Sequence, residues 1–284
     1  MSPANSTTTS FSIGLLWSLL PFLSLFLQGC FLAPLFSKSP PEEVIIEPVS
    51  DLPEDADALV KLADKKVAAQ ISAKELAIAI SALGKAIGLV EEGKAKLEPI
   101  ELQLKLAIAC YLASELEENA PKKMVWITKG IKAAEIVKAA WPDRVEGYYF
   151  ASVLKGRKAE QGGLGAIAQL REIEELALKA EEIDSSFYEG GPLRLLAMFY
   201  ASAPPWPTSV GDLDLALEYA EKAVSVADYP LNHLFLAEIL MAMDEFGRAR
   251  AELKKVLAAP KIGMWAKEGE RWRPRASKLM RQLK

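Results

Sequence analysis

Four segments of this chain repeat one residue pattern, and that repetition limits the possible folds more than any other feature. Each segment carries small or apolar residues spaced first by four positions and then by three, and the segments recur every 33 to 43 residues. The triplets are Gly130, Ala134, Val137; Ile173, Ala177, Ala180; Ala216, Ala220, Ala223; and Ala249, Leu253, Val256. This spacing places three side chains on one face of an α-helix, so each segment is predicted to be a helix that buries a narrow stripe.

Helices with small buried residues are typical of the second helix in each hairpin of a tetratricopeptide array, where neighbouring helices approach closely. The first helix of a hairpin also has a recurring motif. Residues 236–240 precede the fourth triplet at the distance that a repeat of about 34 residues requires, and residues 196–200 carry the same motif one hairpin earlier. Pro142, Pro230 and Pro260 fall near the ends of repeat units. We therefore expect residues 56–284 to form one all-α, tetratricopeptide-like domain, an α-solenoid of helical hairpins.

Composition supports a helical globular body and argues against a nucleic-acid partner. Half of the residues are hydrophobic (51%), which is enough for a globular core. Residues that favour helices dominate, whereas clusters of β-branched residues bounded by turn residues, which would indicate strands, are almost absent. The chain has 34 basic and 38 acidic residues, a net charge of -4. Binding to phosphate backbones would demand a concentrated basic surface, so no nucleic acid is expected as a partner.

The N-terminus forms a separate segment, because the first charged side chain is Lys38. An apolar run over residues 13–27 ends in Leu27-Gln28-Gly29-Cys30, which resembles a bacterial lipobox. Residues 1–29 are then a lipoprotein signal peptide, and Cys30 becomes the acylated first residue of a bilayer-anchored protein. The usual Lys/Arg-rich start of such signals is missing. The alternative is that residues 13–36 remain as an uncleaved membrane helix, for which their uncharged length suffices.

Residues 30–55 are predicted to connect the lipidated cysteine to the folded domain as a flexible tether. Residues 37–55 are rich in Pro, Glu and Ser, and four prolines at positions 40, 41, 48 and 53 oppose helix formation. The domain would therefore work in the aqueous phase beside the membrane.

Two connections within the repeats are longer than a tetratricopeptide hairpin needs. One precedes Ala216 and contains Pro204, Pro205, Trp206 and Pro207. The other precedes Ile173 and contains glycines at 162, 163 and 165. Solenoids place insertions on a common face that often binds partners, so the residues from Pro204 to Pro207 are the candidate interaction loop. The alternative is that both insertions are merely tolerated.

Residues 184–194, 203–207, 211–212 and 232–240 together resemble the T component of TRAP transporters. The resemblance implies a periplasmic lipoprotein with a tetratricopeptide-like body that associates with the transporter's solute-binding protein and handles hydrophobic solutes. It also implies a possible homotrimer with a central apolar pore. It covers about residues 184–260, whereas residues 57–183 match only in helical pattern.

Residue patterns that would indicate a catalytic or metal-binding site are weak in this sequence. We therefore predict that the chain is not an enzyme and needs no cofactor or metal. His233 is the only histidine, with no Cys, Asp or Glu at metal-ligand spacing, and is expected to cap or pack at a helix start. Cys110 lies in a helical apolar pattern and is expected in the core. The glycines at 162–165 lack the strand and the Lys-Ser/Thr of a phosphate loop. Paired acids at 174–175 and 181–182 are interpreted as a solvated helix face.

The C-terminal segment from Trp265 is basic, in contrast to the rest of the chain. It is interpreted first as a polar helix that covers the last repeat, and alternatively as a contact for acidic lipid or a partner.

Two functions remain open from the sequence. The first is a lipid-anchored accessory of a TRAP-type solute transporter that presents a surface or apolar pore to a solute-binding protein. The second is an envelope scaffold that assembles proteins without a small ligand. Both would face the periplasm of the bacterial cell envelope, and we expect the outer membrane.

Overall fold

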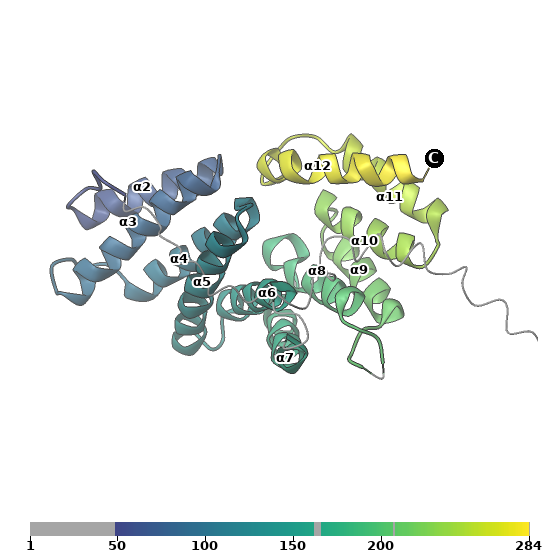
Figure 1. Cartoon of the computed structure of the whole chain (residues 1–284), viewed down its shortest axis with the longest axis horizontal. Helices are drawn as coiled ribbons and strands as arrows, with labels where there is room; N and C mark the ends of the chain where they lie inside the picture. Colours follow the sequence, from purple (N-terminus) through teal and green to yellow (C-terminus); the bar gives the residue numbers. More distant parts are fainter. Residues whose placement is uncertain (1–48, 162–165, 207, 284) are drawn as a thin grey trace, which may run out of the picture. The chain divides into compact units, whose positions relative to one another are not determined.

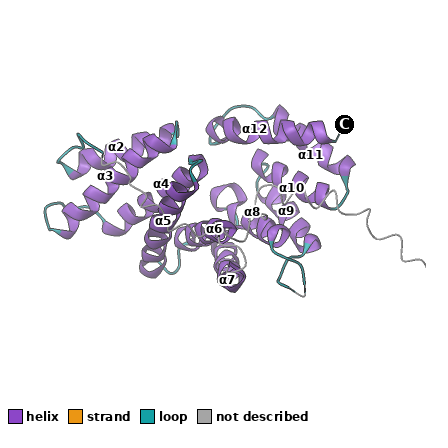
Figure 2. Ribbon diagram, viewed as in Figure 1, coloured by secondary structure: helices purple, strands orange, loops and turns teal. Residues whose placement is uncertain are grey.

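The computed structural model describes residues 49–161, 166–206 and 208–283, which all belong to one compact unit, Lys38–Lys284. Within these ranges the regular elements are α-helices, as Figure 2 shows, and the extended pairing is limited to a single bridge between Pro205 and Gly211. The helices are α2 (Ala56–Ala69), α3 (Ala73–Glu91), α4 (Pro99–Leu116), α5 (Ala120–Ala140), α6 (Val145–Gln161), α7 (Ile167–Asp184), α8 (Phe187–Ser202), α9 (Leu213–Val226), α10 (Pro230–Ala242), α11 (Phe246–Ala258) and α12 (Trp265–Gln282). The all-α prediction is confirmed.

The helices pack as consecutive hairpins, each helix lying against the next in sequence (Figure 1). The first helices of successive hairpins, α4, α6, α8 and α10, also contact one another, and α12 continues this row by contacting α10. The second helices α5, α7, α9 and α11 lie between them along the chain. This two-row arrangement is the layout of a tetratricopeptide-like array.

The four triplets predicted from the sequence lie on α5, α7, α9 and α11, and all of their residues are buried. Close packing explains the small residues. A Cβ atom added at Gly130 of α5 would lie 2.8 Å from the Cβ of Cys110 on α4 and 2.8 Å from a methyl carbon of Leu154 on α6. Three helices therefore meet at Gly130, where no larger side chain fits without displacement.

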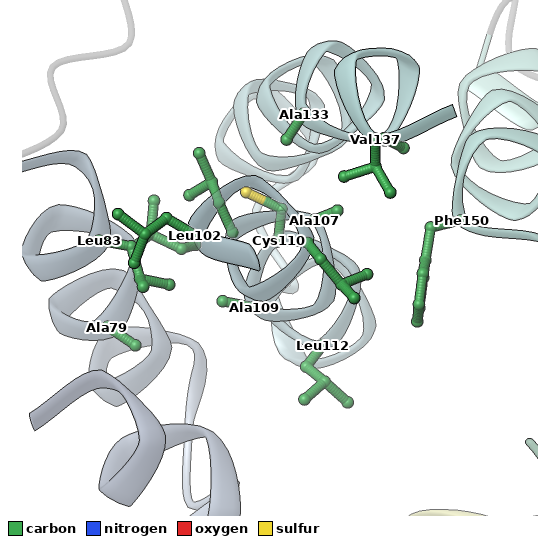
Figure 3. Packing of buried hydrophobic residues seen from close by; sticks show 14 of the residues in the cluster. Ala79, Leu83, Leu102, Ala107, Ala109, Cys110, Leu112, Ala133, Val137 and Phe150 are labelled. Atoms are coloured by element: carbon green, nitrogen blue, oxygen red, sulfur yellow. The ribbon is translucent and has the colours of Figure 1, made fainter. Parts of the chain in front are cut away.

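The core consists of two clusters of buried residues, one mainly on α2 to α6 and one mainly on α8 to α12. Figure 3 shows part of the first cluster: α4 carries Cys110 between Leu83 of α3 and Val137 of α5. Cys110 is fully buried as a free thiol, so its predicted place in the core is confirmed.

Local signals set several helix starts. The side chains of Asp55, Ser72, Asn119 and Asp212 each accept a hydrogen bond from a backbone N–H in the first turn of α2, α3, α5 and α9, respectively. These caps satisfy donors that a helix start leaves unpaired. Proline opens α10 at Pro230, and Pro142 and Pro260 follow the ends of α5 and α11, as the repeat pattern predicts.

The basic C-terminal segment forms α12, which packs on α11 and α10. Its buried residues include Trp265 and Ala276, so it covers the last hairpin. Among the helices that the structure describes, none has the length and apolar character needed to cross a membrane. The predicted signal peptide, Cys30 and the glycines at 162–165 lie outside the described residues.

Candidate binding site

The row of first helices carries a group of aromatic side chains in mutual contact, which we call the aromatic cluster: Tyr111 of α4, Tyr149 and Phe150 of α6, and Phe187 and Tyr188 of α8. Tyr149 lies at the centre, with ring centroids 5.2 Å from Phe150, 5.3 Å from Phe187 and 5.9 Å from Tyr188. Most of these rings meet edge to face, which is the favoured arrangement for aromatic quadrupoles.

Charged side chains surround the aromatic cluster. Arg157 of α6 forms an ion pair with Glu115 of α4, and its guanidinium carbon lies 5.6 Å from the centre of the Tyr111 ring. From α12, the buried carboxylate of Glu268 accepts a hydrogen bond at 2.5 Å from the hydroxyl of Tyr229, the residue before α10. Arg271, one turn further along α12, acts electrostatically on Tyr188. Charged groups of α6 and α12 therefore act on the tyrosines of the cluster.

The tyrosines of this region keep their hydroxyl protons at neutral pH. Burial is the largest influence on Tyr111, Tyr149 and Tyr188, and it raises the pKa of each hydroxyl because an anion would be poorly solvated there. The positive charge of Arg194 acts in the opposite direction on the pKa of Tyr149 but does not cancel the effect of burial. The site therefore offers neutral hydroxyl groups beside guanidinium groups.

The start of α8 contains a backbone conformation that most side chains avoid. Tyr188 (φ 53°), Glu189 (φ 57°) and Gly190 (φ 76°) are three consecutive left-handed residues, after which the regular helix begins. Non-glycine residues in this region cost free energy and persist only where the surroundings hold them in place. Their conformation turns the Tyr188 ring onto Tyr149 and Phe150.

Two buried side chains hold this left-handed turn. Arg194 donates to the carbonyl oxygens of Glu189 (3.0 Å) and Tyr188 (3.2 Å) and to Oδ1 of Asn232 (2.5 Å). The Nδ2 of Asn232 donates to the carbonyl oxygens of Glu189, Ala223 and Ala227 at 3.0 to 3.1 Å. Arg194 and Asn232 are 5% and 1% exposed. This pair ties α8, α9 and α10 together and fixes one wall of the aromatic cluster.

The candidate interaction loop lies on a different part of the array, between α8 and α9. The ring of Trp206 is 84% exposed, the highest exposure of any large hydrophobic side chain in the described residues. Backbone bonds close the loop: Gly211 N–H donates to Pro204 O (2.9 Å) and Asp212 N–H donates to Tyr200 O (3.0 Å). A Cβ on Gly211 would lie 2.0 Å from Ala203 O, so the close approach requires glycine. Pro207 lies outside the described residues.

His233 packs in the first turn of α10, 3% exposed, as expected. Sequence patterns did not single out its two carboxylate neighbours: Nδ1 contacts Glu252 of α11, 19 residues later, at 2.5 Å, and Nε2 contacts Asp228, five residues earlier, at 2.6 Å. These contacts join the start of α10 to α11. Within the described ranges, no group of three or more His, Cys, Asp or Glu side chains could hold a metal ion.

Of the paired acids on α7, Glu175 and Glu182 are exposed and form ion pairs on the same helix with Arg171 and Lys179, in line with a solvated face. Glu174 differs, because it is partly buried and accepts a hydrogen bond from the hydroxyl of Tyr200 at 2.6 Å. This carboxylate has a structural role between α7 and α8.

Sequence patterns did not single out the aromatic cluster, Arg194, Asn232 or Arg271. The family resemblance could have drawn attention to two of them, because Arg194 and Asn232 each lie within segments that resemble the TRAP transporter component. Periodicity alone could not reveal their contact, since 38 residues separate them along the chain.

Comparison with solved structures supports the fold. A thermophilic tetratricopeptide-repeat protein of Thermus thermophilus is similar, with a TM-score of 0.54 and 17% sequence identity; the match covers 79% of this chain and 98% of that chain. At this identity the likeness shows the fold alone, which is tetratricopeptide-like. No family model matches the sequence, and no curated protein matches it either.

Proposed function

We propose that this chain is a lipid-anchored, tetratricopeptide-like binding protein that contacts a partner protein through the loop at 203–211. The observation that carries the proposal is the exposed Trp206 on a loop whose ends are held by backbone hydrogen bonds. Arrays of this fold generally serve in protein recognition, and tryptophan is enriched among the residues that dominate binding energy at interfaces.

Physical features of the loop favour binding over a structural role. Burying a tryptophan side chain removes about 200 Å² from water, which corresponds to about 5 kcal/mol before the costs of association. Pro204 and Pro205 restrict the backbone before any partner arrives, so less conformational entropy is lost on binding. No charged side chain lies between Ala203 and Gly211. Such a loop suits an apolar pocket on the partner.

The finer proposal is an accessory role in a TRAP-type solute transporter of the bacterial periplasm. The support is the sequence resemblance over residues 184–260, which includes the loop itself, together with the lipobox-like Leu27-Gln28-Gly29-Cys30. In this role acylated Cys30 holds the protein at the outer membrane, and the loop contacts the solute-binding protein, with a homotrimer as a possible assembly.

Site-specific photocrosslinking in cells tests the proposal. A benzophenone amino acid at position 206 should capture a solute-binding protein of the TRAP type. The same group at position 71 is the control, because Ile71 is also strongly exposed (72%) but lies between α2 and α3. Equal capture at both positions, or none at 206, would contradict the role of the loop. Capture of an outer-membrane assembly protein would instead support the envelope scaffold that the sequence left open.

A further inference from the structure

The side of α12 that faces away from the core carries a row of positive side chains, which we call the basic face: Lys267, Arg271, Lys278 and Arg281. Their spacing of four, seven and three residues places all four on one side of an α-helix. We propose that the basic face docks on a membrane surface that contains anionic phospholipid. This interaction goes beyond the proposed function and does not depend on the contact made by Trp206.

The packing of α12 separates the basic face from the protein interior. Three buried residues mark the opposite side of the helix, which belongs to the core cluster shared with α10 and α11: Trp265, Gly269 and Ala276. Each of them is two positions from a member of the basic face, which is about 200° around the helix axis. Within the basic face Arg271 is partly buried, and the other three side chains are exposed.

The two carboxylates of α12 do not neutralise the basic face. Glu268 is buried and accepts a hydrogen bond from the hydroxyl of Tyr229. Glu270 lies 3.7 Å from the ammonium group of Lys261, and the other ion pair of α12 uses Arg275, which is not part of the basic face. No member of the basic face forms an ion pair with a residue that the structure describes. Its charges are therefore available to an external anion, although the chain as a whole has a net charge of -4.

The length of the basic face suits a plane of lipid headgroups. With a rise of about 1.5 Å per residue, Lys267 and Arg281 lie about 21 Å apart along α12, so the row can contact several phosphate groups of one bilayer surface. Each Lys or Arg near an anionic membrane strengthens binding about fivefold. The combined attraction of the row is therefore much larger than that of a single surface lysine.

Apolar side chains at the start of α12 favour a lipid surface over an acidic protein surface. Ile262 is 68% exposed, and Met264, one turn before Lys267 on the same side, is 37% exposed. Apolar groups beside a row of cations are typical of helices that lie on membranes, where the apolar groups enter the boundary between headgroups and acyl chains. Docking of α12 would hold a tethered domain in one orientation relative to the bilayer.

Photocrosslinking of the full chain in liposomes tests the proposal. A benzophenone amino acid replaces Met264, the liposomes contain phosphatidylcholine alone or mixed with phosphatidylglycerol, and mass spectrometry measures the fraction of protein that carries a lipid adduct. We expect at least about fivefold more adduct with phosphatidylglycerol. This excess should disappear at about 1 M salt, where charge interactions are screened beyond about 3 Å. The same group at Ile71, which is 72% exposed between α2 and α3, should show neither dependence.

Charge removal tests whether the basic face carries the docking. Combining Lys267→Gln, Lys278→Gln and Arg281→Gln should lower the adduct at position 264 at least about fivefold, because the attraction of three cations is lost. The matched control combines the same change at three exposed lysines that form no ion pair in the described structure: Lys61, Lys65 and Lys132. It has the same net charge and should keep the adduct. Equal melting temperatures of the two variants would exclude misfolding as the cause.

Three results would overturn the proposal: phosphatidylglycerol does not raise the adduct at position 264, positions 71 and 264 respond alike, or the variant without the three cations keeps the full adduct. Capture of an acidic protein at position 264 in cells, with no lipid dependence in liposomes, would also overturn it and would assign the basic face to a protein partner.

Discussion

The guanidinium of Arg194 on α8 donates a 2.5 Å hydrogen bond to the side-chain amide oxygen of Asn232 on α10, with both residues almost fully buried. The pair holds Tyr188, Glu189 and Gly190 in the left-handed region, and so determines where the Tyr188 ring lies. A buried polar contact between two hairpins thus shapes the aromatic cluster. Its strength can be tested by mutation.

Asn232→Ala should lower the free energy of unfolding by about 3 kcal/mol, because it removes the buried side-chain acceptor of Arg194 and the amide that donates to the carbonyls of Ala223 and Ala227. Asn119→Ala is the control. Asn119 caps α5 at an exposed position, so its loss should cost about 1 kcal/mol. Urea denaturation of the full chain measures both. Similar small losses for the two variants would show that the buried pair contributes little.

Glycine substitutions test how tightly the two rows of helices pack. Gly130→Ala should destabilise the protein by about 1 to 3 kcal/mol, because the new methyl group would lie 2.8 Å from side-chain carbons of both Cys110 and Leu154. Gly156→Ala on α6 has nothing within 4 Å of the new Cβ and should stabilise by about 0.5 to 1 kcal/mol through helix propensity. If both variants gained stability on urea denaturation, the close approach at Gly130 would be wrong.

The Gly130 site also shows what could be predicted from sequence. The 4-then-3 spacing of small residues is a local property of each helix, so it predicted the second helices and their buried faces before any tertiary contact was known. Helix starts at Ser72 and Asp212 carry equally local capping signals. The site depends on different information. Asn232 meets Arg194 across two helices, and the left-handed turn at Tyr188 exists because those distant side chains hold it.

The arginines of α12 illustrate the same limit. Their sequence context suggested only a basic covering helix, and nothing local indicates which partner each arginine has. Arg275 pairs with Glu238 of α10, whereas Arg273 donates to backbone carbonyls at the end of α11. The packing of α12 on α10 and α11 decides these different surroundings, and periodicity carries no information about it.

Glu238 should make stability depend on pH. Burial raises its pKa from 4.5 to about 7, although Arg275 acts in the opposite direction. Between pH 4.5 and 7 the Glu238 carboxyl is therefore mostly protonated in the folded state and mostly ionised in the unfolded state. This group lowers the stability of the fold as pH rises through that window. Between about pH 5 and pH 8 the contribution should fall by about 2 to 3 kcal/mol. Glu238→Gln should remove that part of the decline, and identical pH profiles for the two proteins would contradict the assignment.

The anchor prediction concerns Cys30, whose lipobox-like context is Leu27-Gln28-Gly29-Cys30. Cys30→Ser should leave an unprocessed precursor that takes up no labelled fatty acid, because the thiol that accepts the lipid is missing. The chain's other cysteine provides the control: Cys110→Ser removes a thiol that is fully buried in the core and should leave labelling intact. Metabolic labelling with gel analysis reads both outcomes. Labelled Cys30→Ser protein would refute the lipoprotein assignment.

Trp206 provides the last test, which compares two tryptophans in opposite environments. Trp206 is 84% exposed and Trp265 is 2% exposed. Trp206→Ala should therefore change the free energy of unfolding by no more than about 0.5 kcal/mol, whereas Trp265→Ala should cost about 3 to 5 kcal/mol by emptying part of the second core cluster. Denaturant unfolding of the full chain gives both values. The same Trp206→Ala protein should lose affinity for the partner captured at position 206. A loss of stability near that of Trp265→Ala, or unchanged affinity for that partner, would mean that the exposed ring is not the anchor of the contact.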